Sequence, residues 1–237
     1  MVCKRCESKE CIKNGKVRCL QRYLCKNCNY NFVKGDRRTT AGIQAKKACC
    51  VMLYSIGKIS VNMIAKLFDM YRSLVYKWLN EAAVNFGEYE IRDDIEAIEF
   101  DEMWHFIGKK ANKLWIIKAV DRSKHKTIAW VTGNRDTKTF RKLYKKLKHL
   151  KKCKFYTDDW EVFSKVLTKD RHVIGKEHTV TIEQDNSDTR HHLSRFTRKT
   201  KVVSKSENMV NTSLKLWQFL TENTTFKKFQ SVFLSIF

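Results

Sequence analysis

A chain of 237 residues with 43% hydrophobic and 12% aromatic content can bury a real core, which excludes an intrinsically disordered protein. Its formal net charge of +23 repels itself unless a polyanion neutralises it, so we expect nucleic acid or an acidic membrane surface as partner. No stretch reaches the length of a membrane span, and the first residues do not resemble a signal peptide. We therefore expect no membrane partner and a cytoplasmic location.

The first segment, residues 1–38, carries two CxxC motifs. Cys3 and Cys6 form the first motif and Cys25 and Cys28 the second, with 18 residues between them. Tetrahedral zinc takes four thiolates, and each CxxC turn presents two of them from one tight loop. The spacing therefore predicts a zinc ribbon that holds one structural Zn²⁺.

Two further cysteines, Cys11 and Cys19, lie between these motifs. Neither has a partner at CxxC spacing, so we predict that neither is a ligand. With nine cysteines and no export signal, free thiols and metal sites are favoured over disulfides. Basic residues such as Arg22 are interleaved with aromatic ones, which favours contact with nucleic acid over a merely solvated surface.

Residues 39–92 have helical periodicity and predict a helix-turn-helix. Ser60 is placed to cap a first helix that runs to Phe68, and Ser73 to cap a second. A recognition helix presents residues near its start to the major groove of DNA. The outward residues of the second helix are Arg72, Tyr76 and Lys77, opposite a stripe of Leu74, Val75, Trp78 and Leu79. The alternative is an ordinary helical hairpin that packs on its neighbours.

Residues 93–208 alternate between strands and helices. We predict strands at 95–100, 113–121, 126–132, 153–157 and 172–174, and helices at 137–150, 161–167 and 181–200. This β-β-β-α-β-α-β-α order is that of a ribonuclease-H-like α/β domain with a mixed five-stranded sheet. The sequence thus predicts a multidomain chain that ends in a helical tail over 209–237.

Acidic residues stand at the ends of predicted strands and at the start of a helix. Asp101 ends the first strand, Asp158 follows the fourth, and Glu183 begins the helix over 181–200. Charges at the ends of apolar strands are costly unless they are paired or bind a metal, and hard cations prefer carboxylates. On pattern alone the choice stays open, because other acids compete: Glu99, Glu102, Asp185 and Asp188.

The helix predicted over 137–150 and the residues after it are strongly basic, with eight Lys or Arg between positions 141 and 154. Arg141, Lys145 and Lys146 belong to this run. We predict that it forms a face that follows DNA phosphates. The alternative is a solvated helix.

Four stretches of the sequence are specific enough to compare with a known family: Gln21-Arg22-Tyr23-Leu24-Cys25-Lys26-Asn27-Cys28, Asp101-Glu102-Met103-Trp104, Tyr156-Thr157-Asp158-Asp159-Trp160 and Ile182-Glu183. With these stretches the chain resembles the insertion sequence 1 transposase family, and the resemblance covers nearly residues 1–208. The resemblance weakens after Met209.

The resemblance implies a DDE-type transposase that uses two Mg²⁺ or Mn²⁺ ions. The family has 24 residues between its second Asp and its Glu, and this spacing selects Asp158 with Glu183, and Asp101 as the first member. Changes at Asp159 or Glu102 are then expected to cost much less. A basic residue two turns after the Glu often helps to bind DNA in such enzymes, and Arg190 takes that position.

The resemblance also implies the reaction and the partners. Such a protein binds the inverted repeats of its own element as double-stranded DNA, hydrolyses the end phosphodiesters and joins the 3′-OH to target DNA. Because it acts on two ends, we expect at least a homodimer, associated with the bacterial nucleoid. The alternative is a repressor that keeps a catalytically dead nuclease fold.

Overall fold

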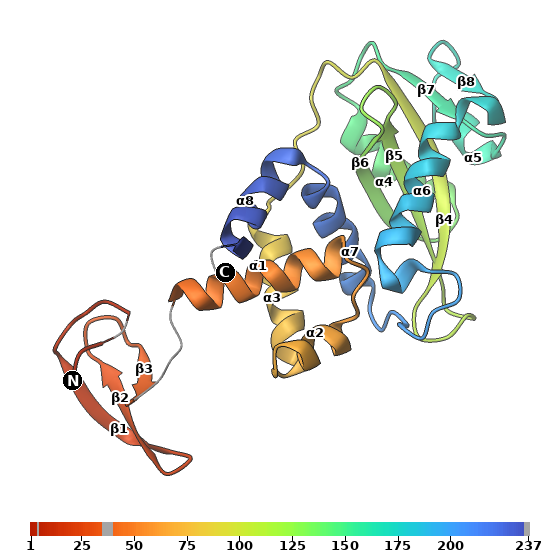
Figure 1. Cartoon of the computed structure of the whole chain (residues 1–237). Coiled ribbons are helices and arrows are strands. Elements are labelled where there is room, and N and C mark those ends of the chain that lie inside the picture. Colours follow the sequence, from red (N-terminus) through yellow and green to blue (C-terminus); the bar gives the residue numbers. More distant parts are fainter. Residues whose placement is uncertain (4, 35–39, 235–237) are drawn as a thin grey trace. The chain divides into compact units, whose positions relative to one another are not determined.

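The structure of the protein is a computed structural model that describes residues 1–3, 5–34 and 40–234. The chain divides into two units, one made of residues 1–49 with those from 229 onward and the other of residues 50–228. Figure 1 shows the elements of both units. The predicted boundary between residues 38 and 39 lies outside the described residues.

The first unit contains a small antiparallel sheet in the order β1-β2-β3, with β1 at Cys11–Val17, β2 at Leu20–Cys25 and β3 at Asn31–Val33. Tyr23 lies opposite Phe32 in the register, and their rings stack with centres 5.9 Å apart. Phe32 is buried together with Cys3 and Cys25. A core this small needs a further source of stability, such as a bound metal.

Three helices follow: α1 (Thr40–Ser55), α2 (Val61–Leu67) and α3 (Arg72–Asn85). Ser60 caps α2 as predicted, because its hydroxyl accepts from the Met63 N–H at 3.3 Å. The prediction that Ser73 caps the next helix is wrong. The Tyr71 carbonyl already accepts from the Leu74 and Val75 N–H groups, so α3 begins at Arg72 without a side-chain cap.

The second unit is built on a five-stranded sheet in the order β6-β5-β4-β7-β8. Its strands are β4 (Ala97–Phe106), β5 (Lys113–Asp121), β6 (Lys126–Gly133), β7 (Lys154–Thr157) and β8 (His172–Ile174). The strands β4, β5 and β6 form an antiparallel meander, whereas β7 and β8 run parallel to β4. The predicted mixed five-stranded sheet is confirmed.

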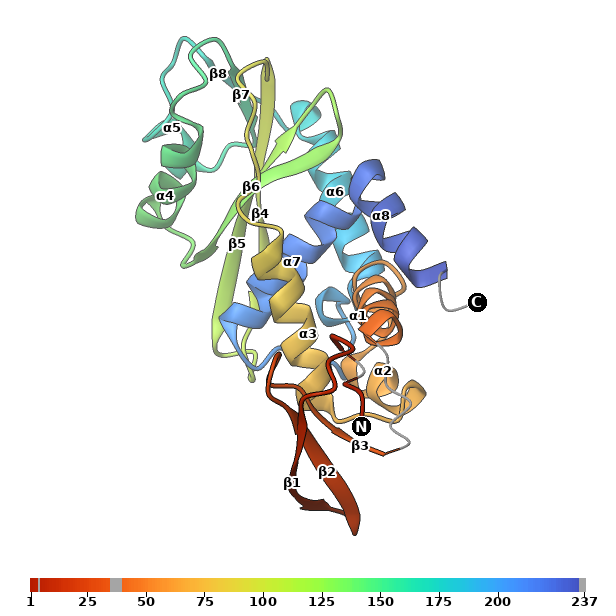
Figure 2. The same ribbon diagram turned by 90° about the vertical axis from the view of Figure 1, so that its left-hand side faces the viewer.

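Helices cover both faces of this sheet (Figure 2). The helices α4 (Thr137–Leu147) and α5 (Glu161–Ser164) pack on one face, around Phe100. On the other face lie α6 (Val180–His192) and α7 (Glu207–Leu220), where Trp217 packs with Met103 and Ile116. Two 3₁₀ turns, η1 (Lys176–His178) and η2 (Ser194–Phe196), flank α6, and α8 (Asn223–Leu234) ends the described chain.

Two predicted boundaries in this unit are wrong. The first strand continues past Asp101 to Phe106, because the pairs Met103–Ile116 and His105–Leu114 extend its ladder with β5. The helix predicted to reach residue 200 ends at His192, and the chain then turns so that Leu193 and Phe196 enter the core. None of the helices in the described part of the chain is long and apolar enough to cross a membrane.

Candidate functional site

The four cysteines of the CxxC motifs come together in the first unit. The sulfurs of Cys3, Cys6, Cys25 and Cys28 all lie within 4.8 Å of one another. Burial alone would raise the pKa of Cys25, but hydrogen bonds from the Cys28 and Asn27 N–H groups and from neighbouring thiols lower it to about 6. A thiolate is the form that binds metal, so this cluster could hold a zinc ion.

The two cysteines predicted not to be ligands lie outside this cluster. The Cys11 thiol points to the Ser8 carbonyl at 3.7 Å, and Cys19 is exposed in the turn between β1 and β2. In the same sheet Arg22 is half-buried, and its Nε donates to the Asn14 carbonyl at 2.8 Å. This bond fixes Arg22 on the hairpin.

A group of carboxylates forms where the pairing of β4 with β7 ends. The last pair in this register is Phe100 with Thr157, so the next residues, Asp101 and Asp158, are neighbours. Beyond that pair no described strand lies on this side of β4. Carboxylate oxygens of Asp101, Asp158 and Glu102 lie within 4.8 Å of one another.

Glu183 lies in the first turn of α6 and is exposed. It is not part of the group within 4.8 Å, but it lines the same open pocket as Asp101 and Glu102, together with Arg190. Hydrogen bonds hold α6 against β4 here. The buried Glu99 carboxylate accepts from the Ile182 N–H at 2.8 Å, and Asp101 Oδ2 accepts from Asn186 Nδ2 at 2.8 Å.

The carboxylates disfavour one another's ionisation. The pKa of Asp101 is raised, first by burial and then by the charges of Asp158 and Glu183, against a hydrogen bond from the Glu102 backbone. Burial likewise raises the pKa of Glu102 to about 7, although Arg135 opposes the shift. The second oxygen of Glu102, Oε2, is buried without a hydrogen-bond partner among the described residues. A hard divalent cation fits this donor set, because it would offset the repulsion and satisfy that oxygen.

Sequence reasoning did not find the surroundings of Glu102. Its Oε1 accepts from Arg135 Nε at 2.7 Å, and the guanidinium lies 4.6 Å from the ring centre of Trp160 and 5.3 Å from that of Trp115. The only available signal was that Glu102 adjoins Asp101. Nothing in the sequence linked Arg135, in the loop after β6, to this strand.

The candidate recognition helix is amphipathic as predicted. Arg72, Tyr76 and Lys77 are exposed on α3, whereas Val75, Trp78 and Leu79 are buried. Lys77 is 3.8 Å from Glu81, an exposed i,i+4 pair that leaves the lysine at the surface. These side chains are therefore free of the core and accessible to a ligand.

The basic helix α4 has a similar division. Arg141, Lys145 and Lys146 are exposed, and the buried residues of this helix are Thr139, Phe140, Leu143 and Leu147. Asp136 caps the helix by accepting from the Thr139 N–H at 2.7 Å. The exposed face of α4 therefore carries a concentrated positive charge.

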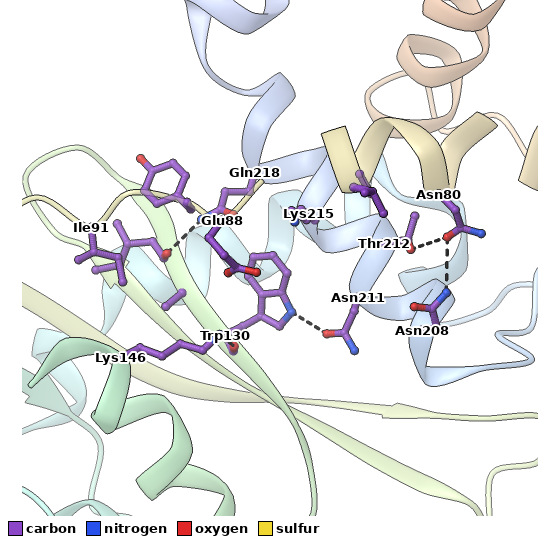
Figure 3. Close-up of a pocket in the computed structure, with 15 residues that line it drawn as sticks. Asn80, Glu88, Ile91, Trp130, Lys146, Asn208, Asn211, Thr212, Lys215 and Gln218 are labelled. Atoms are coloured by element: carbon purple, nitrogen blue, oxygen red, sulfur yellow. Dashed lines mark hydrogen bonds between the residues drawn. The ribbon is translucent and has the colours of Figure 1, made fainter. Parts of the chain in front are cut away.

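A further pocket lies between β6, α3 and α7 (Figure 3). Its polar groups largely bond to one another: Trp130 Nε1 donates to Asn211 at 2.8 Å, and Thr212 donates to Asn80 at 2.8 Å. Gln218 donates to the Ile128 carbonyl at the edge of the sheet. These bonds account for the packing of α7 beside β6, and we assign no chemistry to this pocket.

The carboxylate group on the sheet and the separate thiol cluster define a protein with two candidate metal centres, one suited to a hard divalent cation and one to zinc. Residues 95–223 match the family model described as IS1 transposase. The chain therefore belongs to the IS1 transposase family, which confirms the resemblance found in the sequence. The match continues past Met209 and through α7, so the family likeness extends beyond the point where the sequence motifs fade.

Individual relatives agree with this assignment. The insertion element IS1 protein InsB of Shigella flexneri is 35% identical over 112 residues, which are 47% of this chain and 86% of the relative. The insertion element IS1 2 protein InsB of Escherichia coli strain K12 is 35% identical over 114 residues, 48% of this chain and 68% of that relative.

Proposed function

We propose that the protein is a DDE-type DNA transposase whose ribonuclease-H-like domain, residues 93–208, cuts and joins DNA. In this proposal Asp101, Asp158 and Glu183 hold two Mg²⁺ or Mn²⁺ ions. The observation that carries it is the convergence of Asp101 and Asp158, 57 positions apart in sequence, within 4.8 Å at the end of the β4–β7 ladder. A protein that only binds DNA has no use for converging carboxylates, because their negative charges repel the phosphates of the DNA.

The chemistry follows from the charges in the pocket. When bound, two divalent ions supply Lewis-acid activation at a phosphodiester. The carboxylates of the chain fix the position of that positive charge, and Arg190 adds a cation on the same pocket wall for the DNA backbone. Water attacks the phosphorus at each element end and a 3′-OH is released. That hydroxyl then attacks a target phosphodiester, forms a new bond to its phosphorus and displaces the 3′-OH of the target strand, and no bond between protein and DNA forms.

DNA recognition is assigned to the zinc ribbon, residues 1–38, and to the helix-turn-helix, residues 39–92. The exposure of Arg72, Tyr76 and Lys77 on α3 supports this assignment, because a recognition helix needs such a face. In the ribbon, Arg22 would contact phosphate. The basic face of α4 would follow the DNA backbone through Arg141, Lys145 and Lys146. We further propose that at least two copies act together on the two ends, at the nucleoid.

A cleavage assay distinguishes this function from the alternative, a repressor that binds DNA without cutting it. The full chain is incubated with a duplex that carries the element end and with a scrambled duplex of equal length, in Mg²⁺ and in EDTA. We expect a nick at the element end in Mg²⁺ only. Specific binding in a gel-shift experiment with no cleavage product would favour the repressor.

A further inference from the structure

A second pocket adjoins the carboxylate pocket and holds a cluster of arginines. It has a volume of 390 Å³ and lies between the end of β4, residues 104–106, and the segment 195–204. This segment returns beside the strand, where the Gly108 N–H donates to the Ser204 carbonyl at 2.8 Å. Arg190 and Arg198 line both pockets, so the two pockets share a wall.

The third arginine of this pocket, Arg195, is buried, and no carboxylate among the described residues forms an ion pair with it. Arg195 is only 4% exposed. Its guanidinium donates hydrogen bonds to two neutral hydroxyls, that of Tyr54 at 2.6 Å and that of Ser204 at 3.0 Å. Within the described part of the chain, no carboxylate lies at ion-pair distance from Arg190, Arg195 or Arg198. A buried cation is costly unless an anion accompanies it. The positive charge of these arginines is therefore not balanced by a carboxylate of the described residues.

The remaining titratable group in the wall adds no charge at neutral pH. His105 donates to or accepts from Ser204 at 2.8 Å, and burial, followed by the charges of Arg195 and Arg190, lowers its pKa to about 4. A ligand in this pocket thus meets three guanidinium groups and a neutral imidazole. Guanidinium groups match phosphate oxygens in geometry and charge.

We infer that this pocket, the arginine pocket of Arg190, Arg195 and Arg198, binds a backbone phosphate of the DNA strand next to the phosphodiester that is cut. The inference rests on the proposed function. The two pockets lie next to each other along β4, at residues 101–102 and 104–106, so a DNA strand that follows β4 would pass from the carboxylates to the arginines. Trp104 is three residues from Asp101, ~10 Å along a strand, which corresponds to about three nucleotides of B-form rise.

Aromatic side chains at the same place support a nucleic-acid strand over a small free anion. Trp104 is 38% exposed, although a large apolar side chain is usually buried. The centre of its ring lies 5.4 Å from that of the Phe106 ring. Both residues line the arginine pocket. An exposed indole beside a cationic pocket gives a base a surface on which to stack while its phosphate meets the arginines.

A methylphosphonate scan tests this site, because each such linkage removes the charge of one phosphate. The full chain is bound to element-end duplexes in Ca²⁺, with one neutral linkage placed at successive positions on each side of the cleavage point. Fluorescence anisotropy is measured at several salt concentrations for the wild type, Arg198→Ala and Lys199→Ala. Lys199 is the matched control: it is exposed and basic, follows Arg198 directly and does not line either pocket.

For the wild type we expect one linkage within about three nucleotides of the cut to weaken binding roughly tenfold, as for a lost charge-assisted hydrogen bond. Arg198→Ala should weaken binding to unmodified DNA by a similar factor, flatten the salt slope by about 0.7–0.9, and lose sensitivity to that linkage only. Lys199→Ala should keep the sensitivity of the wild type.

Two results would overturn the inference: equal behaviour of Arg198→Ala and Lys199→Ala, or full sensitivity of Arg198→Ala to every linkage. Arg198 is exposed, so Arg198→Ala should fold, and its circular dichroism is compared with that of the wild type. A parallel cleavage assay of Asp158→Asn separates the two proposals. If Asp158→Asn is inactive while the scan shows no Arg198-dependent position, only the arginine pocket is wrong. If Asp158→Asn cleaves normally, the proposed function fails.

Discussion

The buried ion pair between β5 and α6 predicts a large loss of stability when its lysine is replaced. Lys118 is 1% exposed, and its Nζ contacts Asp185 on α6 and Thr189 Oγ1. Asp185 also accepts from the Thr127 hydroxyl at 2.7 Å, and its side chain is 10% exposed. Lys118→Met keeps a side chain of similar length but removes the positive charge that pairs with Asp185.

The magnitude depends on whether this pair behaves as a surface pair or as a buried one. Surface pairs contribute about 0–1 kcal/mol, whereas removing one partner of a buried pair costs ~3–5 kcal/mol. The side chains of Lys118 and Asp185 are only 1% and 10% exposed, so the pair belongs to the buried class. For a protein of this size each kcal/mol lowers Tm by roughly 2–4 °C, so Lys118→Met should lower it by roughly 6–20 °C.

Differential scanning calorimetry and urea unfolding measure this effect. Lys124→Met is the control, since Lys124 is exposed and lies 3.9 Å from Asp121 in a turn; its Tm should change little. The double variant Lys118→Met with Asp185→Leu removes both charges and should recover most of the loss. A loss below about 1 kcal/mol for Lys118→Met, or a double variant less stable than the single one, would refute the reasoning.

Three further predictions concern other parts of the chain. Elemental analysis should find one zinc per chain, retained in Cys19→Ser and lost in Cys25→Ser; no zinc, or no change in Cys25→Ser, contradicts the thiol site. Arg72→Ala or Lys77→Ala should cost ~1–3 kcal/mol of binding if a base is read, or reduce the salt slope by about 1 if a phosphate is contacted. If neither quantity changes, α3 does not touch DNA. The pKa of His105 is lowered from 6.5 to about 4, so the neutral form stabilises the fold above pH 6.5 and this contribution is lost as pH falls toward 4. Between these values the free energy of unfolding should fall by up to roughly 3 kcal/mol more for the wild type than for His105→Gln, and equal slopes would argue against a buried neutral histidine.

Local signals in the sequence predicted the sheet, whereas the spacing of the family resemblance was needed to select Asp101 and Asp158 among the competing acids. Apolar runs mark β4 and β7, and Asp101 and Asp158 follow the last residues that pair between them. The parallel pairing of these strands then brings the two acids together. The length of β4 was missed, because the acidic pair after Phe100 looks like a strand end, whereas its continuation depends on pairing with β5.

The acid group itself depends on long-range packing and could not be predicted in full. The sequence motifs mark Glu102 as a mild control, yet its carboxylate lies with Asp101 and Asp158, whereas Glu183 lies outside that group. Arg135, from a distant loop, holds the Glu102 carboxylate in place by donating a hydrogen bond to its Oε1 at 2.7 Å. Glu102→Gln is therefore not a neutral substitution, and we expect it to weaken Mn²⁺ binding in calorimetry.

Paired substitutions at two adjacent aspartates test the central claim most directly. Asp158 belongs to the carboxylate group, whereas its neighbour Asp159 is exposed and outside it. An amide keeps size and hydrogen bonding but removes the charge that holds a cation. With a labelled element end in Mg²⁺, Asp158→Asn should cut by less than about a hundredth of the wild-type rate, while its DNA binding is unchanged. Asp159→Asn should cut nearly as fast as the wild type. If Asp158→Asn retains wild-type cleavage, or if both variants lose it equally, the carboxylate group is not the catalytic centre.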